Sequence, residues 1–185
     1  MNIEQKIIGK IFFTIIVFTL AVLFSGCGGT GDGDGSPPGT VGENLVKNGG
    51  FEEDFTNWNF NGGQNVCFFL ENAIRADGAK SLKVLDCLWN GLIYQRLNVE
   101  PDTDYVFTVS CLVSRDDSAP WGILIKISED YTRESPLIEV KSAGSGWKSY
   151  KGTFNSKERT TVDLGINGNA SEFFVDRLSV YKVAK

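Results

Sequence analysis

The sequence predicts an all-β fold, a jelly-roll β-sandwich of two antiparallel sheets. From about residue 44 onward, short runs rich in Val, Ile, Phe, Tyr and Thr alternate with clusters of Gly, Asn, Asp, Ser or Pro. This spacing is typical of sandwiches and barrels. Many of these runs are apolar at every second position, so each strand offers one face to a core. Two sheets packed face to face are the simplest way to bury all of these faces.

The run from residue 105 to 114 shows the alternation most clearly. It places one set of side chains on a single face, which we expect in the core: Tyr105, Phe107, Val109, Cys111 and Val113. A similar set follows at Ile123, Ile125 and Ile127. Near the C-terminus, alternation predicts a shared face for Phe174, Asp176, Leu178 and Val180.

The N-terminus has the pattern of an export signal. Lys6 and Lys10 precede an uncharged apolar run, residues 11–24, which is too short for a comfortable membrane span. Residues 1–26 are therefore predicted to be a signal peptide. The ending Ser25-Gly26-Cys27 resembles the bacterial lipobox, with Phe24 where leucine is usual. We expect a lipid anchor at Cys27 and a place in the cell envelope outside the cytoplasm, with the outer membrane or cell surface favoured. An uncleaved anchor is the alternative.

Residues 27–43 are rich in Gly, Asp and Pro and are predicted to be a flexible tether. Residues 44–185 have the size of a single domain. The chain has a formal net charge of −5, which argues against a nucleic-acid partner. It contains no histidine, which excludes a Ser-His-Asp mechanism.

Three cysteines lie in the predicted domain, in a compartment that permits disulfides. A hairpin centred near Asp77 would set Cys67 opposite Cys87, and we predict a disulfide between them. Cys111 lies in an alternating strand and is expected to be a small buried apolar side chain.

Several segments, in their order along the chain, resemble the CenC-like carbohydrate-binding modules of the family 4, 9 and 22 group. The most specific are Asn48-Gly-Gly-Phe-Glu52 and Phe174-Val-Asp-Arg-Leu-Ser-Val180, with Gly78-Ala-Lys-Ser-Leu-Lys-Val84 between them. The resemblance implies a jelly roll that binds polysaccharide or oligosaccharide without catalysis.

The resemblance also implies one structural calcium ion between the terminal segments. Glu52 and Asp176 would be its carboxylate ligands, with backbone carbonyls around Gly50 and Lys80 completing the shell. Arg177 stands where this family commonly has a second acidic or amide residue. The alternative is that hydrogen bonds or a salt bridge satisfy both carboxylates.

Sugar binding needs flat apolar surface together with polar groups that bond to hydroxyls. Trp58 and Trp147 match family positions that are usually structural, so we expect both in the core. Trp89 and Trp121 follow or open strands at loops and are candidate sugar platforms, against the alternative of burial. The remaining candidates are Tyr94 and Arg96, on the face opposite the core side of their strand, and Tyr131 in a loop.

Three functions compete. The first is a non-catalytic polysaccharide-binding lipoprotein, and the second is a structural or adhesive lipoprotein that kept the fold without a sugar site. Convergence of Trp89, Tyr94 and Trp121 on one exposed strip would favour the first. The third is a glycosidase with two carboxylates. The acidic clusters of this chain, residues 52–54, 116–117 and 129–130, lie mostly in predicted turns. We therefore expect that the protein is not an enzyme.

Overall fold

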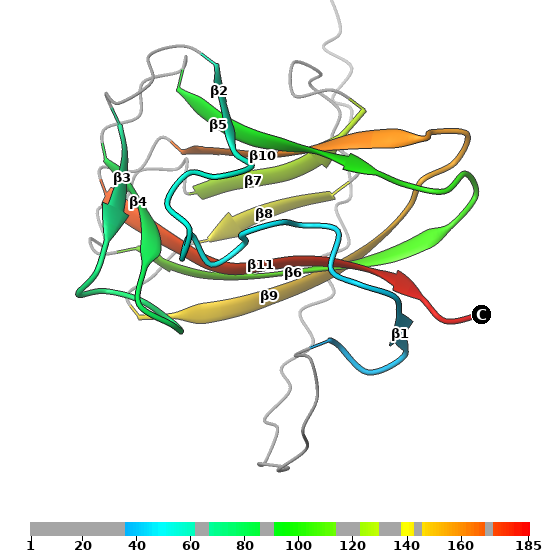
Figure 1. Cartoon of the computed structure of the whole chain (residues 1–185), viewed down its shortest axis with the longest axis horizontal. Helices are drawn as coiled ribbons and strands as arrows, with labels where there is room; N and C mark the ends of the chain where they lie inside the picture. Colours follow the sequence, from blue (N-terminus) through cyan, green and yellow to red (C-terminus); the bar gives the residue numbers. More distant parts are fainter. Residues whose placement is uncertain are drawn as a thin grey trace, which may run out of the picture. The chain divides into compact units, whose positions relative to one another are not determined.

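In the computed structural model, every regular element of the described residues is a β-strand (Figure 1). The structure describes residues 36–61, 67–85, 91–113, 123–129, 138–142, 146–168 and 172–185. The strands are β1 (Thr40–Val41), β2 (Asn59–Asn61), β3 (Phe68–Glu71), β4 (Ser81–Leu85), β5 (Leu92–Asn98), β6 (Asp104–Val113), β7 (Ile123–Ser128), β8 (Ile138–Ser142), β9 (Lys148–Asn155), β10 (Thr161–Gly168) and β11 (Glu172–Val183).

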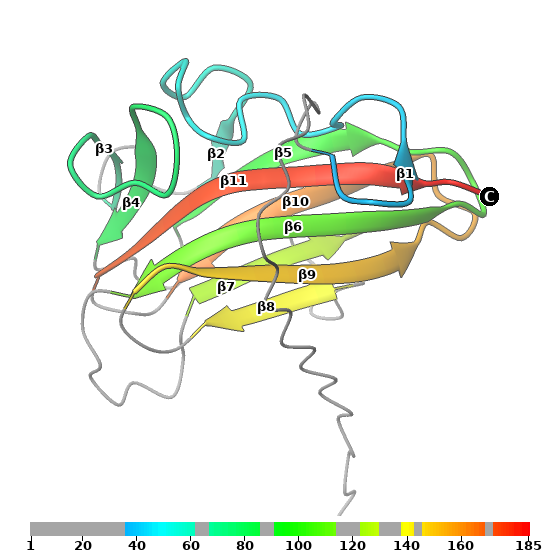
Figure 2. The same ribbon diagram turned by 90° about the horizontal axis from the view of Figure 1, so that it is seen from below.

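These strands form two antiparallel sheets that pack face to face, which confirms the predicted sandwich. One sheet has the order β3-β4-β11-β6-β9, with β1 added to β11, and the other has the order β2-β5-β10-β7-β8. Figure 1 shows the two sheets as separate layers, and Figure 2 shows β1 beside the end of β11 near the C-terminus. Every strand pairing in both sheets is antiparallel.

The core lies between the sheets and contains the predicted residues of β6. All five side chains expected there are buried: Tyr105, Phe107, Val109, Cys111 and Val113. From the other sheet, Ile93, Ile125 and Leu164 meet them. Apolar residues at every second position thus place one side of each strand in a shared core, as the alternation predicts.

β11 departs from the predicted alternation because it contains a β-bulge. Its pairing with β6 shifts between Asp176 and Ser179, and Arg177 adopts a left-handed backbone conformation with φ 55°. The extra residue reverses which side chains face the core. The core residues of β11 are Phe173, Val175, Leu178 and Val180. The expectation that Phe174 and Asp176 share a face with Leu178 and Val180 is therefore wrong.

The segment from Asn44 to Trp58 closes the sandwich between β11 and β5. The Leu45 amide donates to Val180 O and the Leu178 amide donates to Gly49 O, so this segment continues the sheet edge. On the other side, the Gln95 amide group bonds the backbone of Lys47 at 2.8 and 2.9 Å. Phe51 and Trp58 stack in the core with ring centroids 5.1 Å apart.

Strand pairing with β11 begins before Asn44. Thr40 and Val41, within the predicted tether, pair with Lys182 and Val183 of β11, and the Ala184 amide donates to Gly39 O. The predicted signal peptide and lipidation site, residues 1–27, lie outside the described residues. Within the described part of the chain, no helix is long and apolar enough to span a membrane.

The structure confirms some of the predictions for the cysteines and tryptophans and contradicts one. Cys111 is a free, fully buried thiol, as expected. Cys67 is disulfide-bonded, but Cys87 lies outside the described residues, so their pairing stays a prediction. In the β3–β4 hairpin Cys67 stands opposite Leu85, whose amide donates to Cys67 O at 2.9 Å. Trp58 is in the core, whereas Trp147 is only half-buried, so the expectation of a core Trp147 is wrong.

Candidate functional site

The outward face of the five-stranded sheet carries polar side chains around one aromatic ring. On β5, Tyr94 is half-buried and Arg96 is exposed. The residues that alternate with them are buried: Ile93, Gln95 and Leu97. Tyr94 and Arg96 therefore point away from the core, as their sequence parity predicts. They share this face with outward residues of β2, β10 and β7.

One row of cross-strand neighbours runs across four strands through the aromatic ring. Asn59 of β2 pairs with Tyr94 of β5, Tyr94 pairs with Gly165 of β10, and Gly165 pairs with Lys126 of β7. Residues paired directly across a sheet project to the same side. The row therefore combines an aromatic ring, an amide and an ammonium group with a position that has no side chain.

The next row contains an ion pair. Arg96 pairs with Asp163 of β10, and its Nε and Nη2 donate to the two carboxylate oxygens at 2.8 and 3.0 Å. The Asp163 side chain is fully buried, whereas the Arg96 side chain is 57% exposed. This bidentate arrangement fixes the plane of the guanidinium. Ser128, the next neighbour of Asp163, is also buried.

Asp163 was not among the residues predicted from sequence, although a signal for it exists. In β10 the buried apolar residues Val162, Leu164 and Ile166 alternate with Asp163, Gly165 and Asn167. The part of this pattern that the sequence shows is a carboxylate between the apolar residues of an alternating strand. The pairing of β5 with β10, 67 residues apart, could not be read from the sequence.

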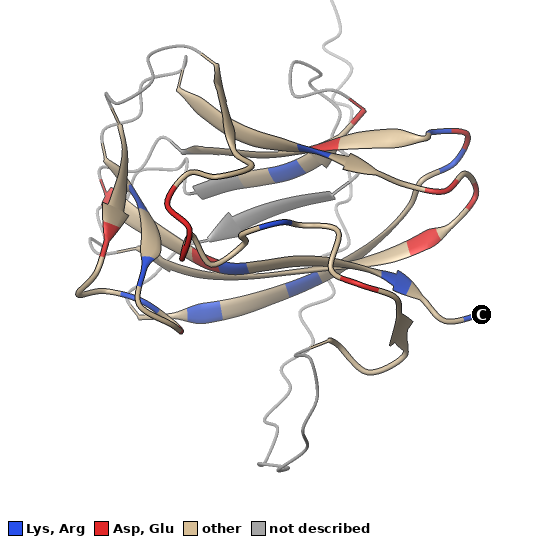
Figure 3. Cartoon of the chain, in the orientation of Figure 1, with Lys and Arg blue, Asp and Glu red and all other residues tan. Residues whose placement is uncertain are grey.

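A groove of about 1120 Å³ opens at the end of this face beside Arg96. Its charged lining is balanced, with Arg96, Lys157 and Arg159 against Asp102, Glu129 and Glu158. Arg159 contacts Glu129 at 3.6 Å, and its Nε is buried without a hydrogen-bond partner among the described residues. Figure 3 shows basic and acidic segments interspersed over both sheets of the described chain. The groove thus offers many polar groups but little net charge.

The remaining predicted sugar-binding residues, Trp89, Trp121 and Tyr131, lie outside the described residues. Their convergence with Tyr94 therefore stays a prediction. Of the acidic clusters considered for glycosidase chemistry, residues 116–117 also lie outside the described residues. In the cluster at 52–54, Glu52 bonds backbone amides and Asp54 pairs with Lys80.

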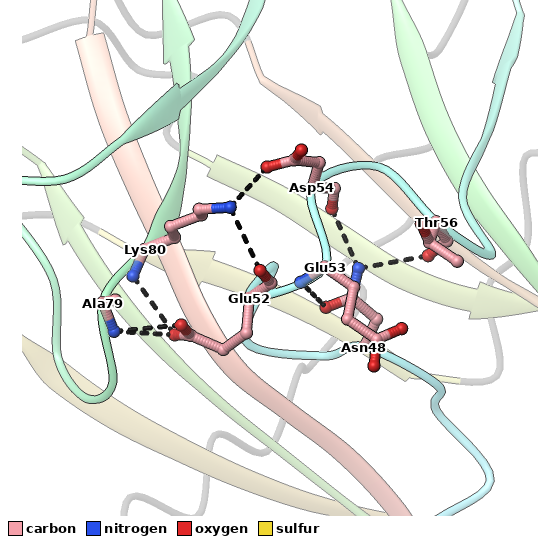
Figure 4. A network of polar contacts seen from close by, with 7 residues as sticks. All are labelled: Asn48, Glu52, Glu53, Asp54, Thr56, Ala79 and Lys80. Atoms are coloured by element: carbon pink, nitrogen blue, oxygen red, sulfur yellow. Dashed lines mark hydrogen bonds and ion pairs between the residues drawn. The ribbon is translucent and has the colours of Figure 1, made fainter.

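A second polar cluster holds residues 48–54 and β11 to the turn between β3 and β4. Glu52 accepts hydrogen bonds from the amides of Ala79 and Lys80 at 3.0 and 3.1 Å (Figure 4). The Lys80 ammonium bonds Glu52 O and the Asp54 carboxylate, and the Asn48 side chain organises the same loop. Gly78 is required here because a Cβ would lie 2.1 Å from Glu52 Oε1.

Asp176 holds the first half of the same turn. Its Oδ2 accepts from the amides of Ala76 and Asp77 at 2.8 and 3.0 Å, and its Oδ1 accepts from Arg177 N at 2.7 Å. Burial raises the pKa of Asp176, these three amides lower it, and the neighbouring Asp77 charge raises it further. The net direction is upward, so the ionised carboxylate lacks full compensation.

These carboxylates partly fit the ligand set of a hard cation. Glu52, Asp77 and Asp176 line one cavity of about 500 Å³, and Gly50 lies beside both Glu52 and Asp176. No three His, Cys, Asp or Glu side chains of the described residues gather closely enough to hold an ion. An ion would therefore depend on Glu52, Asp176 and backbone oxygens.

Comparisons with known proteins identify the family. A model described as "Carbohydrate binding domain" matches residues 43–172, which include the outward face of the five-stranded sheet and Glu52, but not Asp176. No curated protein matches the chain.

Several solved carbohydrate-binding modules share the fold. A family 16 module is 13% identical with TM-score 0.58 and covers 74% of this chain and 99% of that one. The CBM22-1 xylan-binding domain of Xyn10C from Paenibacillus barcinonensis is 17% identical with TM-score 0.57, covering 79% and 98%. TmCBM61, solved in complex with β-1,4-galactotriose, is 21% identical with TM-score 0.56, covering 76% and 99%.

The structural similarity at these low identities concerns the fold, whereas the sequence-family match spans most of the chain. That match indicates a binding module rather than a catalytic domain. The chain belongs to the carbohydrate binding domain family.

Proposed function

We propose that this protein is a non-catalytic polysaccharide-binding lipoprotein, and that its site is the outward face of the five-stranded sheet. The observation that carries the proposal is the grouping of Tyr94, the Arg96–Asp163 pair and Lys126 on neighbouring strands in a member of this family. An aromatic ring covers the apolar face of a pyranose, and fixed polar groups bond its hydroxyls.

The charge of the site supports an uncharged polymer as the ligand. Asp163 neutralises Arg96, and the adjoining groove balances its acidic and basic side chains. Among proteins of the same fold, one is a xylan-binding domain and another was solved with β-1,4-galactotriose. We therefore place neutral plant or microbial polysaccharides first among the candidate ligands. Trp89, Trp121 and Tyr131 remain proposed contributors.

The test is retention of the mature chain, residues 27–185 with Cys27→Ser, on β-glucans, xylans, mannans and galactans. Pull-down serves for insoluble polymers and affinity electrophoresis for soluble ones. We expect binding to one class, weakened about tenfold by Tyr94→Ala because the sugar loses its stacking surface. Thr153→Val, an exposed change on β9 of the other sheet, should bind normally.

Two results would contradict this proposal. Retention by no polymer, with a folded protein, would favour the structural or adhesive lipoprotein. Retention that is unchanged in Tyr94→Ala and Arg96→Ala would move the sugar site to another surface.

The proposed location rests on the N-terminal sequence. Lys6, Lys10, the apolar run 11–24 and Ser25-Gly26-Cys27 support export and lipidation of Cys27. Metabolic labelling with an alkyne fatty acid should mark the wild-type chain in the membrane fraction. Cys27→Ser should abolish the label, and a label that persists would contradict lipidation at this residue.

We further propose a structural calcium ion held by Glu52 and Asp176 with backbone oxygens near Gly50 and Lys80. The cavity lined by Glu52, Asp77 and Asp176 supports this assignment. The positive charge of the ion would offset the negative charges of Glu52 and Asp176, and the ion would hold residues 48–52 to the turn before β4.

A further inference from the structure

The outward face of the six-stranded sheet is hollowed above β11, β6 and β9. The cavity there has a volume of about 500 Å³, a size typical of small-ligand pockets. Its acidic edge, at Glu52 and Asp176, belongs to the cluster that holds the turn before β4. Other side chains of its lining take no part in that cluster or in the proposed site on the five-stranded sheet: Thr108, Ser110, Ser149, Arg177 and Ser179.

Hydroxyl side chains form the floor of this cavity. Ser110 of β6 pairs with Ser149 of β9, and Thr108 of β6 pairs with Ser179 of β11. Paired residues project to the same side of a sheet, as do residues two apart on one strand, so these hydroxyls share the outward face. The two pairs are bonded at 3.2 and 2.6 Å. A hydroxyl donates one hydrogen bond and accepts two, so this floor can still bond a ligand.

The β-bulge of β11 places Arg177 in the wall of the same cavity. Its φ of 55° is left-handed, which costs free energy for a residue with a side chain. Bulges often re-aim a side chain beside a functional site. The Arg177 side chain is 57% exposed, and its Nε lies 3.7 Å from Asp77 Oδ2, which is longer than a hydrogen bond. Among the described residues, this guanidinium therefore has no partner at hydrogen-bond distance.

A neutral polyhydroxyl ligand fits this combination of groups. Arg177 can donate to sugar hydroxyls, and the exposed Asp77 carboxylate beside it can accept from them. The carboxylates of Glu52 and Asp176 at the edge of the cavity disfavour an anion. Tyr181, the aromatic residue of the described lining, is only 5% exposed. We therefore expect weaker binding here than on the five-stranded sheet.

We propose that this cavity is a second saccharide-binding site, separate from the face that carries Tyr94. It takes roughly one or two sugar units of a neutral glycan, whose hydroxyls bond Arg177, Asp77 and the hydroxyl floor. Because the two sites lie on opposite sheets, one module can hold two glycan chains. The inference rests on the proposed glycan-binding function for the class of its ligand, and its residues are different ones.

The competing explanation is that the cavity is only the solvent-filled edge of the carboxylate cluster. A substitution on β9 separates the two, because β9 is two strands away from Asp176, beyond Ser110 of β6. Ser149 is exposed, so Ser149→Leu should leave Tm unchanged while its side chain fills the cavity. Thr153 lies on the same outward side of β9 and does not line the cavity, so Thr153→Leu is the matched control.

The experiment titrates the mature chain with trisaccharides of β-glucan, xylan, mannan and galactan and follows amide signals by NMR. Wild type is compared with Tyr94→Ala/Arg96→Ala, the parent variant, which removes the first site. We expect one trisaccharide to shift the signals of residues 108–110, 149 and 177–179 in the parent variant, in a saturable way.

Added to the parent variant, Ser149→Leu should weaken this binding at least about tenfold, because leucine clashes with the ligand. Arg177→Gln should weaken it about fivefold or more, because a charged donor is lost. Thr153→Leu should bind as the parent variant does. Tm should be the same for Ser149→Leu and Thr153→Leu.

The other outcomes are distinguishable. Shifts around Tyr94 in wild type without shifts around Arg177 overturn the second site and leave the proposed function in place. Equal affinities of Ser149→Leu and Thr153→Leu also overturn the second site. Shifts around Arg177 alone support the second site and contradict the proposed site on the five-stranded sheet. No shifts on either sheet, with no polysaccharide retained, overturn the function and the second site together.

Discussion

Asp176 and Asp163 are both buried aspartates on central strands, but they bind different kinds of partner. Asp176 accepts hydrogen bonds from three backbone amides. Asp163 accepts two from the guanidinium of Arg96, whose side chain is 57% exposed. The amides belong to the backbone of a turn, so their bonds to Asp176 break only if the turn unfolds. The guanidinium of Arg96 lies at the surface, where it can contact a ligand as well as Asp163.

The comparison teaches that burial of a carboxylate does not by itself indicate its role. Asp176 and Glu52 both accept hydrogen bonds from the turn before β4 and so hold this turn to residues 48–54. Figure 4 shows the bonds of Glu52. Around Asp163, the acidic group orients a cation toward solvent. We expect the first region to control stability and the second to control binding.

The largest expected effect is on stability. Asp176→Ala leaves three amides in a buried site without their acceptor, and we expect the free energy of unfolding to fall by about 3 kcal/mol. Urea unfolding measures this change. Glycan affinity of the folded fraction should stay at the wild-type value. A variant as stable as wild type would show that water replaces the carboxylate.

The effect of calcium on stability tests the same region, around Glu52 and Asp176. If calcium is present at about 100 times its Kd, it should stabilise the protein by about 2.7 kcal/mol, because it binds the folded state alone. The measurement is Tm in calcium chloride against Tm in a chelator. Asp163→Asn should keep the full response, and Asp176→Ala should lose it. Identical Tm values for wild type in both solutions would contradict the calcium proposal.

Asp163→Asn should affect binding more than stability. The guanidinium of Arg96 loses its charged partner and is no longer held in one plane, so we expect glycan affinity to fall about five- to tenfold. Affinity electrophoresis gives the change. Asp104→Asn, a change to an exposed acid on β6, is the matched control and should bind normally. Equal affinities of both variants would show that Arg96 needs no orientation.

The smallest effect is expected at Cys111, which belongs to neither region. Burial raises the pKa of its thiol to about 12, so the thiol stays protonated and unreactive at neutral and mildly basic pH. Iodoacetamide at pH 8 should modify it in urea and not in the folded protein. Rapid modification under native conditions would show that β6 opens locally.

Much of the sandwich could be predicted from alternation. The residues from Tyr105 to Val113 lie in the core because a strand points every second side chain to the same side. The same parity placed Tyr94 and Arg96 on the outward face. Alternation failed in β11 because the bulge at Arg177 inserts one residue and reverses which side chains face the core. A bulge is defined by the pairing with the partner strand, so it could not be predicted from this strand alone.

Residues whose role depends on a distant partner were harder to predict. Asp163 was missed because its meaning comes from Arg96, on a strand 67 residues away in sequence. Trp147 was assigned to the core from its family position, but it is half-buried before β9. The convergence of Glu52 and Asp176 was expected, whereas the amides of the turn that they bind were not named.

By itself, the sequence determined the all-β class and the core face of most strands. It also determined the two acidic motifs at the ends of the domain, residues 48–52 with Glu52 and residues 174–180 with Asp176. These features are local, since alternation and turn residues act over a few positions. The tertiary structure alone decided strand order, the bulge and the neighbours of each outward residue. Asp163 is an example, because only the pairing of β5 with β10 places Arg96 beside it.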